Sequence, residues 1–123
     1  MKMKENNIKR LFVIITSLVL LLSCDTYPKE GLWTDYYDNG KKKEEGTFKD
    51  GKREGLFTTW YENGQKQKEG NMKIGRPDGL FTFWYDNGQK ESEGTWRDGE
   101  PVGKWTYYNE DGTVKEVKDF GDG

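Results

Sequence analysis

The sequence predicts an all-β fold, an elongated antiparallel β-meander of four 24-residue β-hairpin repeats. The segment GLWTDYYDNG and its variants GLFTTWYENG, GLFTFWYDNG and GKWTYYNEDG begin at residues 31, 55, 79 and 103, so the period is 24 residues. A fixed period of this length indicates one supersecondary unit stacked on itself. Aromatic residues make up 15% of the chain and recur at fixed positions within the unit. The expected repeats therefore span residues 31–54, 55–78, 79–102 and 103–123.

The segment before the repeats is typical of an exported lipoprotein. A basic leader precedes Leu11–Leu22, an apolar run of 12 residues. This run is too short for a spanning helix, whereas a short apolar run after basic residues is typical of a secretory signal. The letters LLSC at residues 21–24 resemble the bacterial lipobox, and the resemblance implies removal of residues 1–23 and acylation of Cys24, the one cysteine of the chain. We expect a signal peptide at residues 1–23, lipidation at Cys24, a polar tether at 24–30 and a location in the bacterial cell envelope.

Each repeat is expected to contain two strands and two turns. In the second repeat the first strand is Leu56–Tyr61 (LFTTWY), which is rich in aromatic and β-branched residues. A turn at residues 62–64 (ENG) leads into the second strand, Gln65–Met72, and a further turn at residues 73–76 (KIGR) leads into the next repeat. Glycine, and less readily asparagine, accepts the positive φ that tight hairpins need.

Side chains alternate between the two faces of a strand, so each face carries columns of repeated residues. One face of the first strands is predicted to carry Trp33, Phe57, Phe81 and Trp105. The other is predicted to carry the leucines Leu32, Leu56 and Leu80 and the aromatic residues Tyr36, Trp60, Trp84 and Tyr108. The second strands add Phe48, Met72, Trp96 and Phe120. Cross-strand packing within these columns is expected to stabilise the sheet.

Glycine and proline mark special positions in the repeats. Gly46, Gly70 and Gly94 fall inside second strands, where glycine usually marks a close approach. The predicted register places Gly70 opposite Leu56 or Phe57, and we expect a bulky first-strand side chain over each of these glycines. Proline is expected in the tether and turns, outside the strand ladders, at Pro28, Pro77 and Pro101.

The fourth repeat is more polar than the others. Lys104 stands in place of a leucine, Asn109 in place of the second tyrosine, and Lys118 in place of the mid-strand glycine. Polar substitutions of this kind are typical of a terminal repeat, whose outer edge faces water.

Composition disfavours several classes of function. The chain contains no histidine, the usual general base and metal ligand. The net charge is −2 overall and −5 after residues 1–23, which hold four basic residues and one acidic residue, so nucleic acid is not an expected partner. One acidic residue per turn is too few for a calcium loop. A column of Glu45, Glu69 and Glu93 is expected as a solvated surface feature. We expect no enzyme activity, no metal and no cofactor.

The repeat unit resembles a known family. The pattern G-x-[WF]-T-x-[WY]-Y-x-N-G followed by E-G-x-[FM]-x-x-G is similar to the MORN repeat, and closer to the variant form in bacterial proteins labelled YwqK-family antitoxins. The resemblance implies an elongated β-hairpin scaffold associated with protein–protein contact and membrane proximity. A cytosolic toxin would be out of reach of an exported lipoprotein.

Three functions follow from these patterns. The first is a membrane-anchored, non-catalytic scaffold for a protein partner, with Tyr36, Trp60, Trp84 and Tyr108 as the candidate binding surface. Either these aromatics stay exposed on an open sheet, or twist folds the sheet on itself and buries them. The second is a cell-wall or glycan-binding module, because WTYY at 105–108 with DG at 111–112 resembles choline-binding repeats, which hold a quaternary ammonium between aromatic rings. The third is an antitoxin-like protein.

Overall fold

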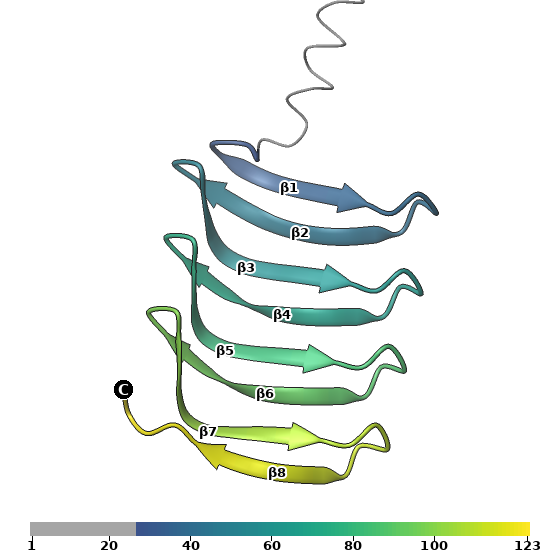
Figure 1. Ribbon diagram of the computed structural model, residues 1–123. Helices are drawn as coiled ribbons and strands as arrows, with labels where there is room; N and C mark the ends of the chain where they lie inside the picture. The colour runs from purple at the N-terminus through teal and green to yellow at the C-terminus, as the bar shows by residue number, and fades with distance from the viewer. Residues whose placement is uncertain (1–26) are drawn as a thin grey trace, which may run out of the picture.

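The computed structural model describes residues 27–123, and it confirms the all-β antiparallel meander. One sheet contains eight strands in the order of the chain, and every strand pairs with the next (Figure 1). The strands are β1 (Gly31–Tyr36), β2 (Lys42–Lys49), β3 (Lys52–Trp60), β4 (Lys66–Lys73), β5 (Arg76–Trp84), β6 (Lys90–Arg97), β7 (Glu100–Tyr108) and β8 (Val114–Asp119). The expected signal peptide and Cys24 lie outside the described residues.

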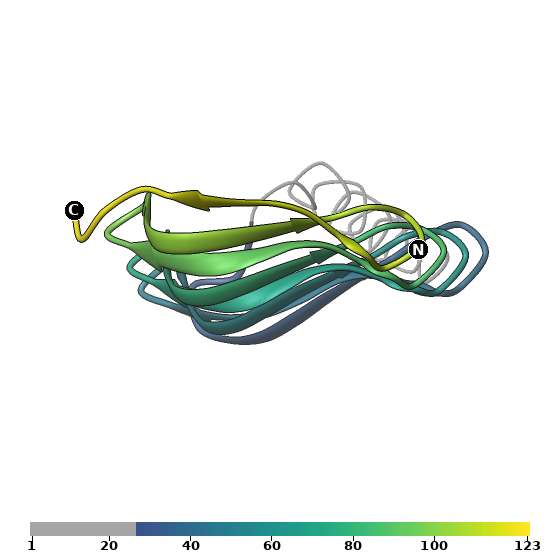
Figure 2. The same ribbon diagram turned by 90° about the horizontal axis from the view of Figure 1, so that it is seen from below.

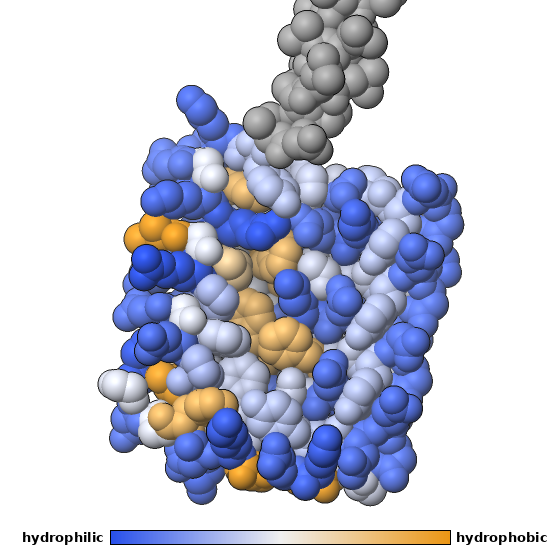
Figure 3. All heavy atoms as spheres, in the orientation of Figure 1, coloured by the Kyte–Doolittle hydropathy of each residue, from blue (hydrophilic) through white to orange (hydrophobic). Residues whose placement is uncertain are grey.

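The sheet is a single open layer with two different faces. Seen along the array, the strands form shallow arcs, and the sheet does not close on itself (Figure 2). One face, here called the core face, carries the buried side chains Phe48, Phe57, Met72, Phe81 and Trp105. Figure 3 shows apolar side chains down the middle of this face with hydrophilic ones on either side. The opposite face, here called the leucine face, carries Leu32, Leu56 and Leu80, which are 58–70% exposed.

Large rings lying over glycines bury the core face without a second layer. A Cβ added to Gly70 would lie 2.2 Å from the ring of Phe81, and one added to Gly94 would lie 2.2 Å from the ring of Trp105. For Gly46 the nearest atom is Cδ2 of Phe57, at 2.9 Å. The expectation of a bulky first-strand side chain over each glycine is confirmed. Each covering ring comes from the following repeat, so this contact joins neighbouring repeats.

Neighbouring rings of the core face also pack edge to face. The rings of Trp96 and Trp105 lie 5.5 Å apart at 89°, and those of Trp105 and Phe120 lie 6.3 Å apart at 81°. Edge-to-face pairs add about 0.5–1.5 kcal/mol each beyond the area they bury. The aromatic columns of the sequence therefore form a continuous herringbone in the third and fourth repeats.

The three-residue loops between the strands of each hairpin carry contacts to the next repeat. In the second repeat the N–H of Gly64 donates to the carbonyl of Tyr61 at 2.9 Å, and Gly64 has a φ of 89°. The sequence analysis offered Asn63 as a second residue tolerant of positive φ, but its backbone has no positive φ. Its side chain accepts from the N–H of Gln65 and donates to the carbonyl of Asp86 in the third repeat at 2.7 Å.

Tyrosine hydroxyls make a second set of bonds between repeats. Tyr37, Tyr61 and Tyr85 donate to the carbonyls of Trp60, Trp84 and Tyr108, at 2.6–2.8 Å. Burial is the main cause that raises the pKa of Tyr61. The fourth repeat has Asn109 and Asp111 at the places of this tyrosine and of the loop asparagine. No repeat follows within the described residues, so the fourth repeat has lost the two donors that would have no acceptor there.

The turns between repeats contain two residues. Asp50-Gly51, Ile74-Gly75 and Asp98-Gly99 all have positive φ, as a type I′ turn requires. Further along each first strand, Gly55, Gly79 and Gly103 also have positive φ. At Gly55 the register shifts, because the three residues 54–56 of β3 lie opposite Thr47 of β2. This bulge bends the strand, and the bend is visible at the start of β3, β5 and β7 (Figure 1).

The prediction that proline lies outside the ladders was wrong for two residues. Pro77 is the second residue of β5, paired with Met72, and Pro101 is the second residue of β7, paired with Trp96. Lys73 and Arg76 close the turn, so the next pair, Met72 and Pro77, exchanges no hydrogen bond. The missing N–H of Pro77 therefore points away from β4, while its carbonyl accepts from the N–H of Gly99 at 3.1 Å.

Residues 27–30, expected in the tether, contact the first hairpin. The ring of Tyr27 stacks on Phe48 at 5.1 Å and meets Trp33 edge-on at 5.0 Å. The carbonyl of Lys29 accepts from the N–H of Gly51 at 2.8 Å, and Oε1 of Glu30 accepts from the N–H of Asp50 at 2.9 Å. The folded array thus extends to Tyr27.

Replacing Gly70 with alanine is expected to lower the free energy of unfolding by about 2 kcal/mol, because the new methyl group must displace the ring of Phe81. Urea-induced unfolding followed by tryptophan fluorescence measures the change. Gly46→Ala is the matched control and is expected to lose less, because its nearest neighbour is farther away. Equal stability of both variants and the unaltered protein would contradict the tight ring-over-glycine contact.

Replacing Tyr61 with phenylalanine is expected to lower the free energy of unfolding by about 1 kcal/mol, because the carbonyl of Trp84 loses its hydroxyl donor. The same unfolding experiment measures this loss. Tyr107→Phe is the control, since the Tyr107 hydroxyl donates no hydrogen bond within the described residues. A loss as large in the control would show that the inter-repeat bond contributes nothing specific.

Candidate interaction surface

The candidate aromatic residues of the sequence analysis lie together on the leucine face. Tyr36, Trp60, Trp84 and Tyr108 end β1, β3, β5 and β7, respectively. Tyr36 is 55% exposed and the other three are half-buried. No second layer of the described residues covers this face, so of the two outcomes considered for the aromatics the structure shows the open sheet.

Lysines of the second strands alternate with these aromatics. Lys42 is paired with Tyr36, Lys66 with Trp60 and Lys90 with Trp84. The Nζ of Lys42 lies 5.5 Å from the ring centroid of Trp60, and the Nζ of Lys66 lies 5.8 Å from that of Trp84, within cation–π distance. The sequence analysis did not single out these lysines, although their 24-residue spacing was visible. Their place beside the rings depends on register.

Each of these lysines is ion-paired to the carboxylate three residues later. Lys42 donates to Glu45 at 2.6 Å, Lys66 to Glu69 at 2.7 Å, and Lys90 to Glu93 at 2.7 Å. The glutamate side chains are only 27–29% exposed. Hydroxyls of Thr34 and Thr58 also donate to Glu45 and Glu69. The column expected as a solvated feature is instead a half-buried, paired row in the middle of the face.

These contacts change the acidity of the groups that make them. The hydrogen bond from Lys42 is the largest cause that lowers the pKa of Glu45, and the same bond raises the pKa of Lys42. Lys90 and then the hydroxyl of Tyr108 lower the pKa of Glu93, and that carboxylate raises the pKa of Tyr108. The row stays charged and internally neutralised near neutral pH, so the leucines beside it are the part of the face with no partner.

The leucines form one straight row across three repeats. Leu32, Leu56 and Leu80 lie 70%, 58% and 60% exposed, and their cross-strand neighbours are the small polar residues Thr47, Asn71 and Thr95. In the fourth repeat Lys104 takes this place, opposite Asp119. The apolar row therefore ends before the last hairpin.

A cluster on the core face was not anticipated from the sequence. Arg53 lies 4.3 Å from the ring centroid of Phe57 and 4.9 Å from that of Tyr27, and its guanidinium donates to Glu44 at 2.9 Å. The other repeats carry Pro77 and Pro101 at the position of Arg53. This departure from the repeat was the signal, and its role is to hold Tyr27 on the first hairpin.

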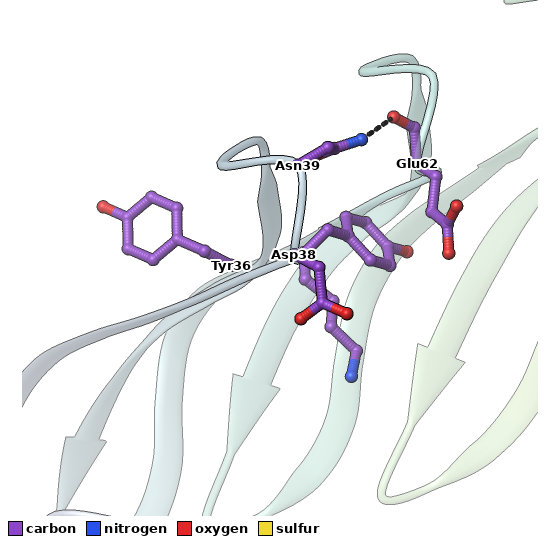
Figure 4. Close-up of a pocket in the computed structure, with 6 residues that line it drawn as sticks. Tyr36, Asp38, Asn39 and Glu62 are labelled. Atoms are coloured by element: carbon purple, nitrogen blue, oxygen red, sulfur yellow. Dashed lines mark hydrogen bonds between the residues drawn. The ribbon is translucent and has the colours of Figure 1, made fainter.

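A shallow hollow of about 400 Å³ lies between the first two loops and is lined by Tyr36, Tyr37, Asp38, Asn39, Lys43 and Glu62. Figure 4 shows Asp38 and Glu62 pointing to the same side while Tyr36 points away, and the bond from Asn39 to the carbonyl of Glu62 is drawn. Within residues 27–123 no group of three or more His, Cys, Asp or Glu could hold a metal ion. The hollow offers no set of ligands for a cation.

Comparison with protein families identifies the repeats. The model of the MORN repeat variant family matches residues 29–50, 53–73, 77–98 and 101–120, which is more than half of the chain. The chain belongs to the MORN repeat variant family. The matched segments correspond to the four hairpins, and the MORN array is thus the described domain. No curated protein matches the chain.

Two further findings bear on the membrane. The described part of the chain contains no helix long and apolar enough to cross a bilayer. Cys24, the expected lipidation site, lies outside the described residues, so its modification stays a prediction.

Replacing Glu93 with glutamine is expected to reduce the pH dependence of stability. Because the folded state lowers the pKa of Glu93, the stabilisation is present above the ordinary glutamate range and is lost as pH falls through the folded pKa. At neutral pH the variant is expected to lose about 0.5 kcal/mol, a small value because the pair is partly solvated. Urea titrations at neutral and acidic pH measure both effects, with the exposed loop variant Glu110→Gln as the control. An unchanged acid slope in Glu93→Gln would contradict the ladder's role.

Proposed function

We propose that this MORN protein is a membrane-anchored lipoprotein of the bacterial envelope, and that its array is a non-catalytic scaffold binding another protein through the leucine face. The observation that carries the proposal is the leucine row, in which three large apolar side chains at equivalent positions are 58–70% exposed. Contiguous exposed apolar patches are typical of binding surfaces.

Folding does not account for the leucine row. The buried residues of the sheet lie on the opposite face, where Phe57, Phe81 and Trp105 are each 4% exposed. Each leucine leaves most of its surface in water, so it contributes little of the roughly 1.5–3 kcal/mol that full burial of such a side chain provides. A partner surface would bury it.

The membrane anchor is supported by the leader and by Cys24. The basic residues, the 12-residue apolar run and the lone cysteine at the end of LLSC all agree with lipoprotein processing. An acylated Cys24 with two or more chains would hold the protein stably at a membrane.

A glycan or choline ligand is less well supported by the same face. A cation bound between the aromatics would need the space beside Trp60 and Trp84 that Lys42 and Lys66 occupy. A toxin partner in the cytosol is not proposed, because the leader predicts export. The leucine row is thus the better candidate for the contact surface.

Photocrosslinking in cells tests the proposed surface. A benzophenone amino acid in place of Leu56 is expected to form a covalent adduct with one protein partner, whereas the same group at Glu110, on a loop, is expected to form none. Changing Leu32 and Leu80 to serine in the Leu56 crosslinking protein is expected to abolish the adduct and leave urea unfolding unchanged, since both side chains are exposed.

Two results would contradict the proposal. Equal crosslinking from Leu56 and Glu110 would show that the leucine face has no special partner. A purified protein with an intact Met1 and no lipid mass on Cys24 would refute the anchor, and mass spectrometry provides that measurement.

A further inference from the structure

We infer that the exposed edge of the first hairpin, here called the β1 edge (Tyr27, Leu32 and Tyr36), contacts the surface of an anionic phospholipid bilayer, so that the array stands away from the membrane with β8 at its far end. The inference rests on the proposed lipid anchor at Cys24. It adds the part of the fold that meets the lipid and the orientation of the leucine face.

The length of chain between the anchor and the fold carries the first step. Folded structure begins at Tyr27, whose ring is held by Phe48, Trp33 and Arg53. Three residue steps separate Tyr27 from Cys24, and they span at most roughly 10 Å. Because β1 is the first strand of the sheet and β8 the last, β8 lies about 34 Å farther along the array, at seven strand spacings of about 4.8 Å. A tether this short brings the β1 edge to the lipid surface.

The side chains of the β1 edge suit the interface between lipid and water. Leu32 is the most exposed leucine of its row at 70%, and Tyr36 and Tyr27 are 55% and 46% exposed. Tyrosine has an apolar ring and a polar hydroxyl, and it is enriched where membrane meets water. Each of these side chains is exposed where no preceding repeat packs against it within the described residues.

The two edge strands of the sheet are protected in different ways. All six residues of β8 are exposed, and four of them are charged: Lys115, Glu116, Lys118 and Asp119. Charged side chains on an edge strand prevent pairing with other chains in water. β1 (GLWTDY) has one charged residue, Asp35. The β8 edge is built for water, whereas the β1 edge needs a cover.

Charge is distributed along the array in the sense that an anionic surface would favour. Residues 27–49 contain five basic and five acidic residues, whereas residues 98–123 contain three basic and seven acidic residues. The fourth repeat is therefore repelled by anionic lipid and the first is not, which orients the array with β1 toward the bilayer.

Fluorescence from a dye at one site tests the contact in the full chain, reconstituted with its anchor into vesicles of phosphatidylcholine with phosphatidylglycerol. An environment-sensitive dye on Leu32→Cys is expected to shift to the blue and to be quenched by spin-labelled lipid headgroups. The matched controls are Leu80→Cys, in the same row about 19 Å farther from the membrane, and Val117→Cys on β8, and both are expected to report water. All three positions are exposed, so labelling should leave the fold intact.

A charge on the edge provides a second measurement. With the dye on Tyr36→Cys, the added substitution Leu32→Glu is expected to reverse most of the blue shift, whereas Leu80→Glu is expected to leave it unchanged. The unfolding curve of each variant checks that the array is folded.

Several outcomes would overturn the inference. Equal quenching at Leu32, Leu56 and Leu80 would show that the array lies flat on its leucine face. A dye at Leu32 that reports water would show a free edge, and a disulfide between two copies of Leu32→Cys would show that a second copy covers it. The mass of Cys24 is measured separately, so an absent lipid refutes the anchor, while the dye positions decide the contact.

Discussion

The array depends on one contact, the ring of one repeat lying on a glycine of the repeat before it. Phe57, Phe81 and Trp105 each occupy the space where a Cβ would stand. A lone hairpin therefore has a glycine without its ring or a ring without its glycine, and its apolar surface is buried only by a neighbour. Since every repeat completes the previous one, stability is shared between repeats, as expected of a linear array.

This contact also divides the sheet into two faces with different roles. Rings that lie flat over the glycines bury one face within a single layer, so the other face is free of the need to form a core. Tyrosine hydroxyls and asparagine amides join each loop to the next and hold equivalent residues in line. The result is a straight leucine row beside a row of paired lysines and glutamates, a surface whose apolar part has no partner in the fold.

Some residues had a visible pattern whose meaning depended on register. Lys66 and Glu69 recur every 24 residues, yet their pairing with each other and the place of Lys66 beside Trp84 follow from which residues lie opposite across β3–β6. Asn63 was assigned a backbone role that Gly64 alone fulfils, because a side-chain bond to the next repeat leaves no local signature. Pro77 was expected in a turn, but the alternation of hydrogen-bonded pairs makes its position in β5 acceptable.

The sequence by itself determined the all-β meander, the four repeats, the two-residue period of the faces and the glycines under rings, because these depend on local periodicity and on turn chemistry. Only the tertiary structure decided that the sheet stays open, that the ring over Gly70 belongs to Phe81, and that Arg53 holds Tyr27 on the first hairpin. These features depend on contacts between repeats, and such contacts are set by curvature and register across strands that a periodic sequence leaves equivalent.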